Sequence, residues 1–141
     1  MYKIFTFVGG ILMTSSVIAA DETTLTKSCA NGAGTIVTGA ISGHEYCLSN
    51  NDRMVWWDAY AWCDALGRQL FKLEDCRCSV DTNCLGRCPE MNGVSIGMYG
   101  WTATPSGTTE AYVIQSGNTA LFHTVARSPS HLNYGFRALC K

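Results

Sequence analysis

The eight cysteines of this 141-residue chain constrain its fold more than any other feature of the sequence. An even number of cysteines in a short chain is typical of a disulfide framework when the chain is exported to an oxidising compartment. Eight cysteines allow 105 pairings, so their number alone does not determine which residues are joined. We expect a small domain held together by disulfides among Cys29, Cys47, Cys63, Cys76, Cys78, Cys84, Cys88 and Cys140.

Residues 1–20 have the composition of a secretory signal peptide. Lys3 supplies the positive charge, Ile4 to Val17 are mainly apolar, and Ile18-Ala19-Ala20 offers small residues for cleavage. An N-terminal membrane anchor is the alternative, but this run is shorter and richer in glycine, serine and threonine than the ~20 residues of a spanning helix. We expect one domain over residues 21–141, located in the periplasm, on the cell surface or in the secreted fraction.

One helix is clear from the periodicity. Trp56, Ala59, Tyr60, Cys63 and Leu66 recur at the spacing of one buried helix face. Of the adjacent Trp56 and Trp57, we favour Trp56 for the centre of that face. The same pattern allows Asn51 or Asp52 to cap the helix and Gly67 to end it.

Short β-type segments lie on both sides of this helix, so the sequence predicts an α+β domain. A turn signal at Pro105-Ser106-Gly107 separates two of them. The expected strands are Thr35–Thr38, Glu45–Leu48, Ser95–Trp101, Ala111–Gln115, Ala120–Val125 and Tyr134–Cys140.

The helix and the C-terminal half resemble the C-type lectin-like family. Trp56-x-x-Ala59-x-x-x-Cys63-x-x-x-Gly67-x-x-Leu70-x-x-Leu73 resembles the first-helix signature of that family. Gly100-Trp101-Thr102-Ala103-Thr104 and Ala111-Tyr112-Val113 are similar to segments of its secreted bacterial branch. Tyr134-Gly135-Phe136-Arg137 resembles the ending of formylglycine-generating-enzyme-like and retroelement variable-protein domains. The resemblance covers about residues 46–140, and it implies a C-type-lectin-like fold with the bridges Cys63–Cys140 and Cys29–Cys47.

The four cysteines from Cys76 to Cys88 depart from the general family pattern. They could hold zinc as four thiolates, but thiols of an exported chain oxidise readily, so we favour two local disulfides. Cys76 and Cys78 are too close in sequence to pair comfortably. We prefer Cys76–Cys88 enclosing Cys78–Cys84, with Cys76–Cys84 and Cys78–Cys88 as the alternative.

The sequence favours binding over catalysis. His44, His123 and His131 are far apart and show no metal-binding spacing, and the side chains of the adjacent Glu74 and Asp75 tend to diverge. The net charge is −1 and the basic residues are scattered, which excludes a nucleic-acid footprint. The calcium–sugar triplets of many C-type lectins are missing, since Pro89-Glu90-Met91-Asn92 has the wrong order. We expect no cofactor and no metal.

Two groups of residues are candidates for ligand contact. The first is aromatic, and its members could stack on a sugar or a protein unless they belong to the core. The second is the polar stretch before the last strand, where binding loops are often carried. The candidates are Trp101, Tyr112, Asn118, His123, Arg127, His131, Asn133 and Tyr134. We expect a bacterial binding or adhesion module for a glycan or protein on a cell surface. A structural envelope or pilus-associated subunit is the alternative, and an enzyme is a weaker one.

Overall fold

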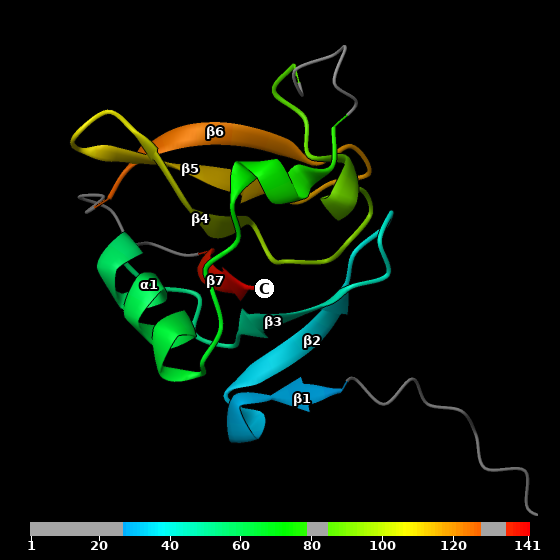
Figure 1. Ribbon diagram of the computed structural model, residues 1–141, viewed down its shortest axis with the longest axis vertical. Helices are drawn as coiled ribbons and strands as arrows, with labels where there is room; N and C mark the ends of the chain where they lie inside the picture. The colour runs from blue at the N-terminus through cyan, green and yellow to red at the C-terminus, as the bar shows by residue number, and fades with distance from the viewer. Residues whose placement is uncertain (1–26, 79–84, 128–134) are drawn as a thin grey trace, which may run out of the picture.

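The computed structural model describes residues 27–78, 85–127 and 135–141. Within these ranges the chain forms one α-helix and seven strands, which confirms the predicted α+β class (Figure 1). Three short 3-10 helices, η1, η2 and η3, join them. The elements in chain order are β1 (Ser28–Cys29), η1 (Ala30–Gly32), β2 (Gly34–Thr38), β3 (Glu45–Ser49), α1 (Trp56–Ala65), η2 (Leu73–Cys76), η3 (Pro89–Met91), β4 (Tyr99–Ser106), β5 (Glu110–Gln115), β6 (Leu121–Ala126) and β7 (Phe136–Cys140).

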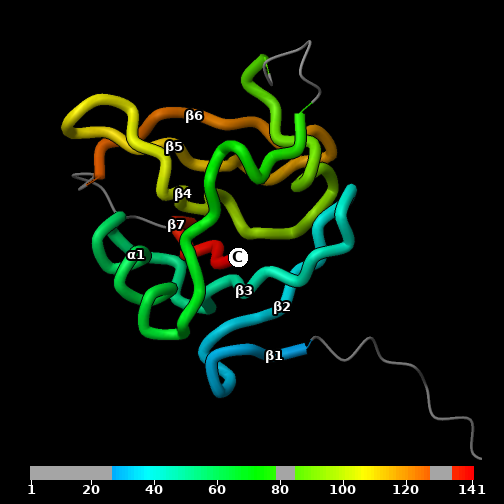
Figure 2. Tube along the Cα trace, in the orientation of Figure 1, coloured from blue at the N-terminus to red at the C-terminus, as the bar shows by residue number. Residues whose placement is uncertain are grey.

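The last strand of the chain lies in the middle of the sheet. The strand order is β1-β2-β3-β7-β4-β5-β6, and the tube in Figure 2 shows β7 between β3 and β4. Strand β7 runs antiparallel to β3 and parallel to β4, while the other neighbours are antiparallel. Strand β7 therefore joins the N-terminal hairpin to the C-terminal group of three strands.

Apolar side chains cover both faces of this sheet. Successive side chains of a strand point to opposite faces. On β7, Ala138 packs into one hydrophobic cluster with Trp56 of α1, whereas Leu139 packs into a second cluster with Met91 of η3. The helix thus covers one face, and the segment that includes η2 and η3 covers the other (Figure 1).

Three expected disulfides are present in the described residues: the two that the family resemblance implies, and Cys76–Cys88 of the preferred pairing in the cysteine-rich segment. Cys29–Cys47 joins β1 to β3, Cys63–Cys140 joins α1 to β7, and Cys76–Cys88 closes the loop between η2 and η3. The Cys76–Cys88 bridge excludes both the alternative pairing and a four-thiolate zinc site. Cys78 is disulfide-bonded as well, whereas Cys84 lies outside the described residues.

The helix begins later than the sequence predicted, so the expected cap at Asn51 or Asp52 was wrong. The N-cap residue is Val55, which makes no side-chain capping bond. The Asn51 side chain instead accepts a hydrogen bond from the Arg53 backbone N–H at 3.0 Å. The preceding segment is bound to the sheet, because Phe136 donates to the Asp52 carbonyl and accepts from the Met54 N–H.

The strand predicted at Ser95–Trp101 begins and ends later, as β4 at Tyr99–Ser106. It continues through Pro105, where a turn was expected. Strand β7 pairs with β4 only from Tyr99 to Trp101, so Pro105 lies in a stretch that has β5 as its one strand partner. Proline is tolerated there because no ladder bond to a second strand is lost.

No helix in the three described ranges is long and apolar enough to cross a membrane.

We predict that the Cys63–Cys140 bridge contributes more stability than the Cys29–Cys47 bridge. The first closes a separation of 77 residues and the second one of 18. The loss of chain entropy on cross-linking corresponds to about 4.5 and about 3 kcal/mol respectively. Urea denaturation of the two double cysteine-to-serine variants, followed by tryptophan fluorescence, measures both values. An equal or smaller loss in the Cys63/Cys140 variant would contradict this ranking.

Candidate functional site

The predicted aromatic candidates do not form a common surface. Trp101 is fully buried, and its indole N–H donates to the Met54 carbonyl at 2.7 Å. Tyr112 is half-buried and packs edge-to-face against Phe122 at 5.5 Å between ring centroids. Tyr134 lies outside the described residues. Trp101 therefore belongs to the core.

The predicted polar candidates are spread along β6. Asn118 is exposed in the turn before that strand, and Arg127 follows its last residue, so the whole six-residue strand, about 20 Å long, lies between them. His123 is exposed between them and shares a hydrogen bond of 2.6 Å with the Gln115 side chain. His131 and Asn133 lie outside the described residues.

Arg127 is the predicted candidate that lies against the aromatic side chains of α1. Its guanidinium lies 4.7 Å from the ring centroid of Trp56 and 5.8 Å from that of Trp57. Trp56 also contacts Trp57 at 4.6 Å and Tyr60 at 5.3 Å between centroids. We call these four residues the aromatic surface. Trp57 is 58% exposed and Tyr60 is 49% exposed, whereas the central Trp56 is buried.

Backbone groups hold the aromatic surface in place. The Arg127 carbonyl accepts a hydrogen bond of 3.0 Å from the Trp56 backbone N–H, in the first turn of α1. The Arg127 side chain donates to the carbonyls of Glu110 at 3.2 Å and Gly107 at 3.4 Å. The Trp56 indole N–H donates to the Thr102 carbonyl at 2.9 Å. The guanidinium and the central ring are therefore oriented before any ligand binds.

A groove continues from the aromatic surface along α1. Tyr60 lines both, so the two features share a side chain. The groove has a volume of about 210 Å³ and combines carboxylate, amide, guanidinium and ammonium groups. Its lining residues are Tyr60, Asp64, Arg68, Gln69, Leu70, Lys72 and Ala103.

The sequence pattern missed most of this surface. Tyr60 was placed on the buried helix face, which was wrong because half of its area is exposed. Trp57 was correctly placed off the centre of that face, and it received no functional role. A large aromatic residue that the helix period places away from the core is the signal that could have found it.

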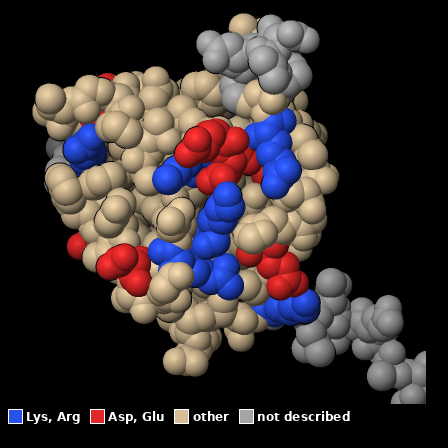
Figure 3. Space-filling model, in the orientation of Figure 1, with Lys and Arg blue, Asp and Glu red and all other residues tan. Residues whose placement is uncertain are grey.

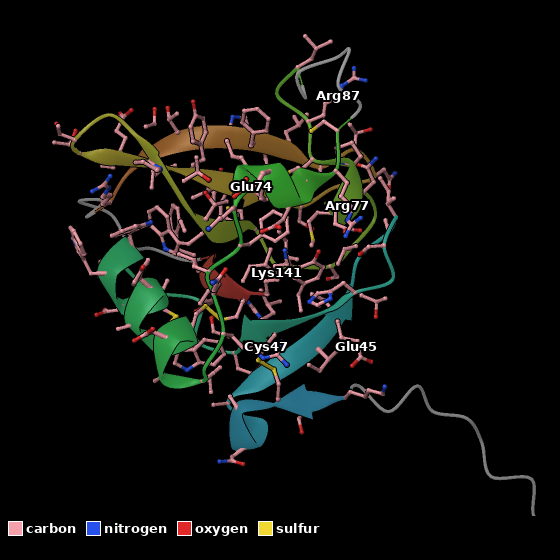
Figure 4. The ribbon with its side chains drawn as sticks, in the orientation of Figure 1. Glu45, Cys47, Glu74, Arg77, Arg87 and Lys141 are labelled. Carbon is pink, nitrogen blue, oxygen red and sulfur yellow. A yellow bond between two sulfur atoms is a disulfide. The ribbon has the colours of Figure 1, made fainter. Side chains whose placement is uncertain are left out.

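Glu90 forms a separate, buried polar cluster. Its side chain is fully buried, and one carboxylate oxygen accepts hydrogen bonds from the Ile41 and Ser42 backbone N–H groups, each at 2.9 Å. The other oxygen accepts from the Tyr46 hydroxyl at 3.1 Å and pairs with Arg77 Nε at 2.9 Å. Arg77 extends from the segment after η2 (Figure 4). The carboxylate thus links the tip of the β2–β3 hairpin to Arg77, in the loop that the Cys76–Cys88 bridge closes.

The surroundings of this cluster shift two pKa values. Burial favours the neutral form of Glu90, but hydrogen bonds from Ser42, Ile41 and Tyr46 outweigh it and hold the pKa of that carboxyl below its usual value. Burial, together with the neighbouring Glu90 carboxylate, raises the pKa of Tyr46 to about 12. Because its oxygens are already occupied, Glu90 has a structural role.

Charged side chains of both signs are mixed on the surface. Figure 3 shows acidic and basic groups next to one another on the face that carries η2. Two of these contacts are ion pairs, Lys141–Asp75 at 2.7 Å and Lys72–Glu74 at 3.9 Å. Within the part of the chain that the structure describes, no three histidine, cysteine, aspartate or glutamate side chains are grouped to hold a metal ion.

Fold and surface together define a disulfide-bonded α+β domain with an exposed aromatic surface on its helix. No protein-family model, curated protein or solved structure matches the chain.

We predict that Glu90→Gln lowers the free energy of unfolding by about 2 kcal/mol at pH 7, because a buried charged acceptor is lost. The loss is smaller at acid pH. The folded-state pKa of Glu90 is depressed. The stability that its ionised carboxylate contributes is therefore fully present above the unfolded-state pKa, and it is lost as pH falls through the folded-state pKa. Urea denaturation from pH 7 to pH 3 measures this difference.

Glu74→Gln is the matched control for this substitution. Its side chain is 75% exposed and only loosely paired with Lys72, so we expect a change below about 0.5 kcal/mol at every pH. Equal effects of the two substitutions would contradict the structural role of Glu90.

We predict that Tyr46→Phe reduces the loss of stability at alkaline pH. The unfolded-state tyrosine ionises near pH 10, whereas the folded-state pKa is about 12, so the native protein loses stability as pH rises between these values. Between pH 8 and pH 11 this loss is about 1 kcal/mol, and it should be absent from the variant. Urea denaturation at the two pH values tests this, and identical losses in both proteins would contradict it.

Proposed function

We propose that the chain is an exported binding module with a C-type-lectin-like fold, and that it recognises a glycan through the aromatic surface. The observation that carries this proposal is the exposure of Trp57 and Tyr60 beside a fixed Arg127. Large aromatic side chains are costly to leave in water, and tryptophan, tyrosine and arginine are the residues enriched at binding hot spots.

The chemistry of the adjoining groove favours a glycan. The face of an aromatic ring can cover the C–H face of a sugar, while polar side chains bind the sugar hydroxyls. The aromatic surface supplies Trp57 and Tyr60 for the first contact. The groove supplies Asp64, Arg68 and Gln69, which together offer donors and acceptors, for the second.

The disulfides support the proposed fold and export. Cys63–Cys140 and Cys29–Cys47 are the two bridges that the resemblance to C-type lectin-like domains implies. A mixed sheet with one main helix is compatible with that family. Disulfides form and persist in secreted and periplasmic proteins, so the framework also fits the proposed signal peptide.

We predict that Trp57→Ala lowers affinity for a glycan about 10- to 30-fold, because truncation of an exposed aromatic anchor removes its contact area. Screening the exported protein on a glycan array in the presence of EDTA identifies the ligand, and calorimetry measures the affinity. EDTA should have no effect, since the calcium–sugar triplets are missing. The free energy of unfolding should change by less than about 0.5 kcal/mol because Trp57 is exposed.

Leu85→Ala is the matched control, since this residue is 78% exposed and is not part of the aromatic surface. It should bind the glycan as the unchanged protein does. Equal binding by the Trp57→Ala variant would contradict the proposed site. If no glycan binds and the protein co-purifies with envelope assemblies, glycan recognition is wrong and a structural subunit is favoured.

A further inference from the structure

A second groove lies on the sheet face opposite α1. It has a volume of about 430 Å³, within the range of about 300–1,000 Å³ that small-ligand sites occupy. Strand β2 and the segment 94–97 form its walls, and the side chain of Arg137 on β7 lines it. The walls present the aliphatic side chains of Val37 and Val94 and the hydroxyls of Thr35 and Ser95.

Arg137 lacks the partners that a half-buried guanidinium normally has. Its Nε atom is buried and makes no hydrogen bond to the part of the chain that the structure describes. Within that part the guanidinium makes one hydrogen bond, from Nη1 to the Ser49 carbonyl at a long 3.4 Å. Among the described residues, no carboxylate lies within 4.0 Å of it. Arg77 is different, since its Nε pairs with Glu90 at 2.9 Å.

The surrounding backbone makes room for this guanidinium. A Cβ atom at Gly97 would lie 2.9 Å from Arg137 Nε and 3.3 Å from its Cδ. Gly97 also has a φ of +79°, a backbone conformation that residues other than glycine rarely adopt. Glycine at this position therefore lets the segment 94–97 cross directly over Arg137.

An unpaired, partly desolvated cation is costly for the folded protein, and buried charges are normally paired. Because Nε is buried beside Gly97, an anion in the groove would pair with the Nη groups and lower the cost of the positive charge. We propose that the groove binds a carboxylate of an acidic sugar residue, with the Arg137 guanidinium as its charge partner. A guanidinium matches the planar geometry of a carboxylate, which accepts two parallel hydrogen bonds.

The groove walls favour an acidic sugar over a simple anion. The Thr35 hydroxyl donates to the Asn50 side chain at 2.8 Å and can still accept from a sugar hydroxyl. The Ser95 hydroxyl can bond to a second one, and the aliphatic side chains of the groove can cover C–H groups. The choice of a sugar rests on the proposed glycan recognition. The site itself is separate from the aromatic surface, because Leu48 and Val94 pack in the cluster on the face opposite Trp56.

Titration of the folded protein with glucuronate, followed by NMR of the arginine Nε–H groups, tests this proposal. We expect the Arg137 signal to shift with glucuronate and not with glucose. Arg137→Gln should weaken glucuronate binding at least tenfold. Ser95→Phe, a substitution at an exposed residue, should fill the groove and have the same effect even if the Arg137 variant fails to fold.

Trp57→Ala distinguishes the anion site at Arg137 from the proposed glycan site at the aromatic surface. It should leave glucuronate binding unchanged, whereas Arg137→Gln should leave contacts at the aromatic surface intact. An Arg137 signal that stays fixed, or equal affinity in the Ser95→Phe variant, would overturn the groove as an anion site. Tighter binding of a peptide with a free C-terminal carboxylate than of glucuronate would overturn the assignment to an acidic sugar.

Discussion

The disulfide between Cys63 and Cys140 joins the helix to the central strand, and the rest of the structure depends on that junction. Strand β7 hydrogen-bonds to β3 on one side and to β4 on the other, so it connects two halves of the sheet that are far apart in sequence. The bridge holds α1 against this strand. The buried Trp56 then packs over the sheet, and its neighbours on the helix surface acquire fixed positions.

Local chemistry made much of this fold predictable. The segments Thr35–Thr38 and Glu45–Leu48 lie within β2 and β3, because short β-branched and aromatic runs between turn residues favour strands. The choice of Trp56 over Trp57 for the buried helix face is confirmed. The preferred Cys76–Cys88 pairing is confirmed too, although sequence spacing had left its alternative open.

The remaining features depend on contacts between distant segments. Nothing local indicates that Asp52 and Met54 bond to Phe136, and this contact delays the start of α1. The absence of a carboxylate beside Arg137 in residues 27–78, 85–127 and 135–141 is likewise a property of the folded sheet. The sequence indicates Arg127 only as part of a polar stretch, but its position beside Trp57 arises because the residue that follows β6 bonds to the first turn of α1.

The two candidate surfaces lie on opposite faces of one sheet, so a single small domain could bind two parts of a branched or acidic polysaccharide. We propose that the aromatic surface contacts the ligand. The four tryptophans give four indole N–H signals in an NMR spectrum, and titration with the glycan selected by array screening tests this contact. We predict that the Trp57 signal shifts while that of the buried Trp101 stays fixed. A ligand that binds without moving the Trp57 signal would contradict contact with the aromatic surface.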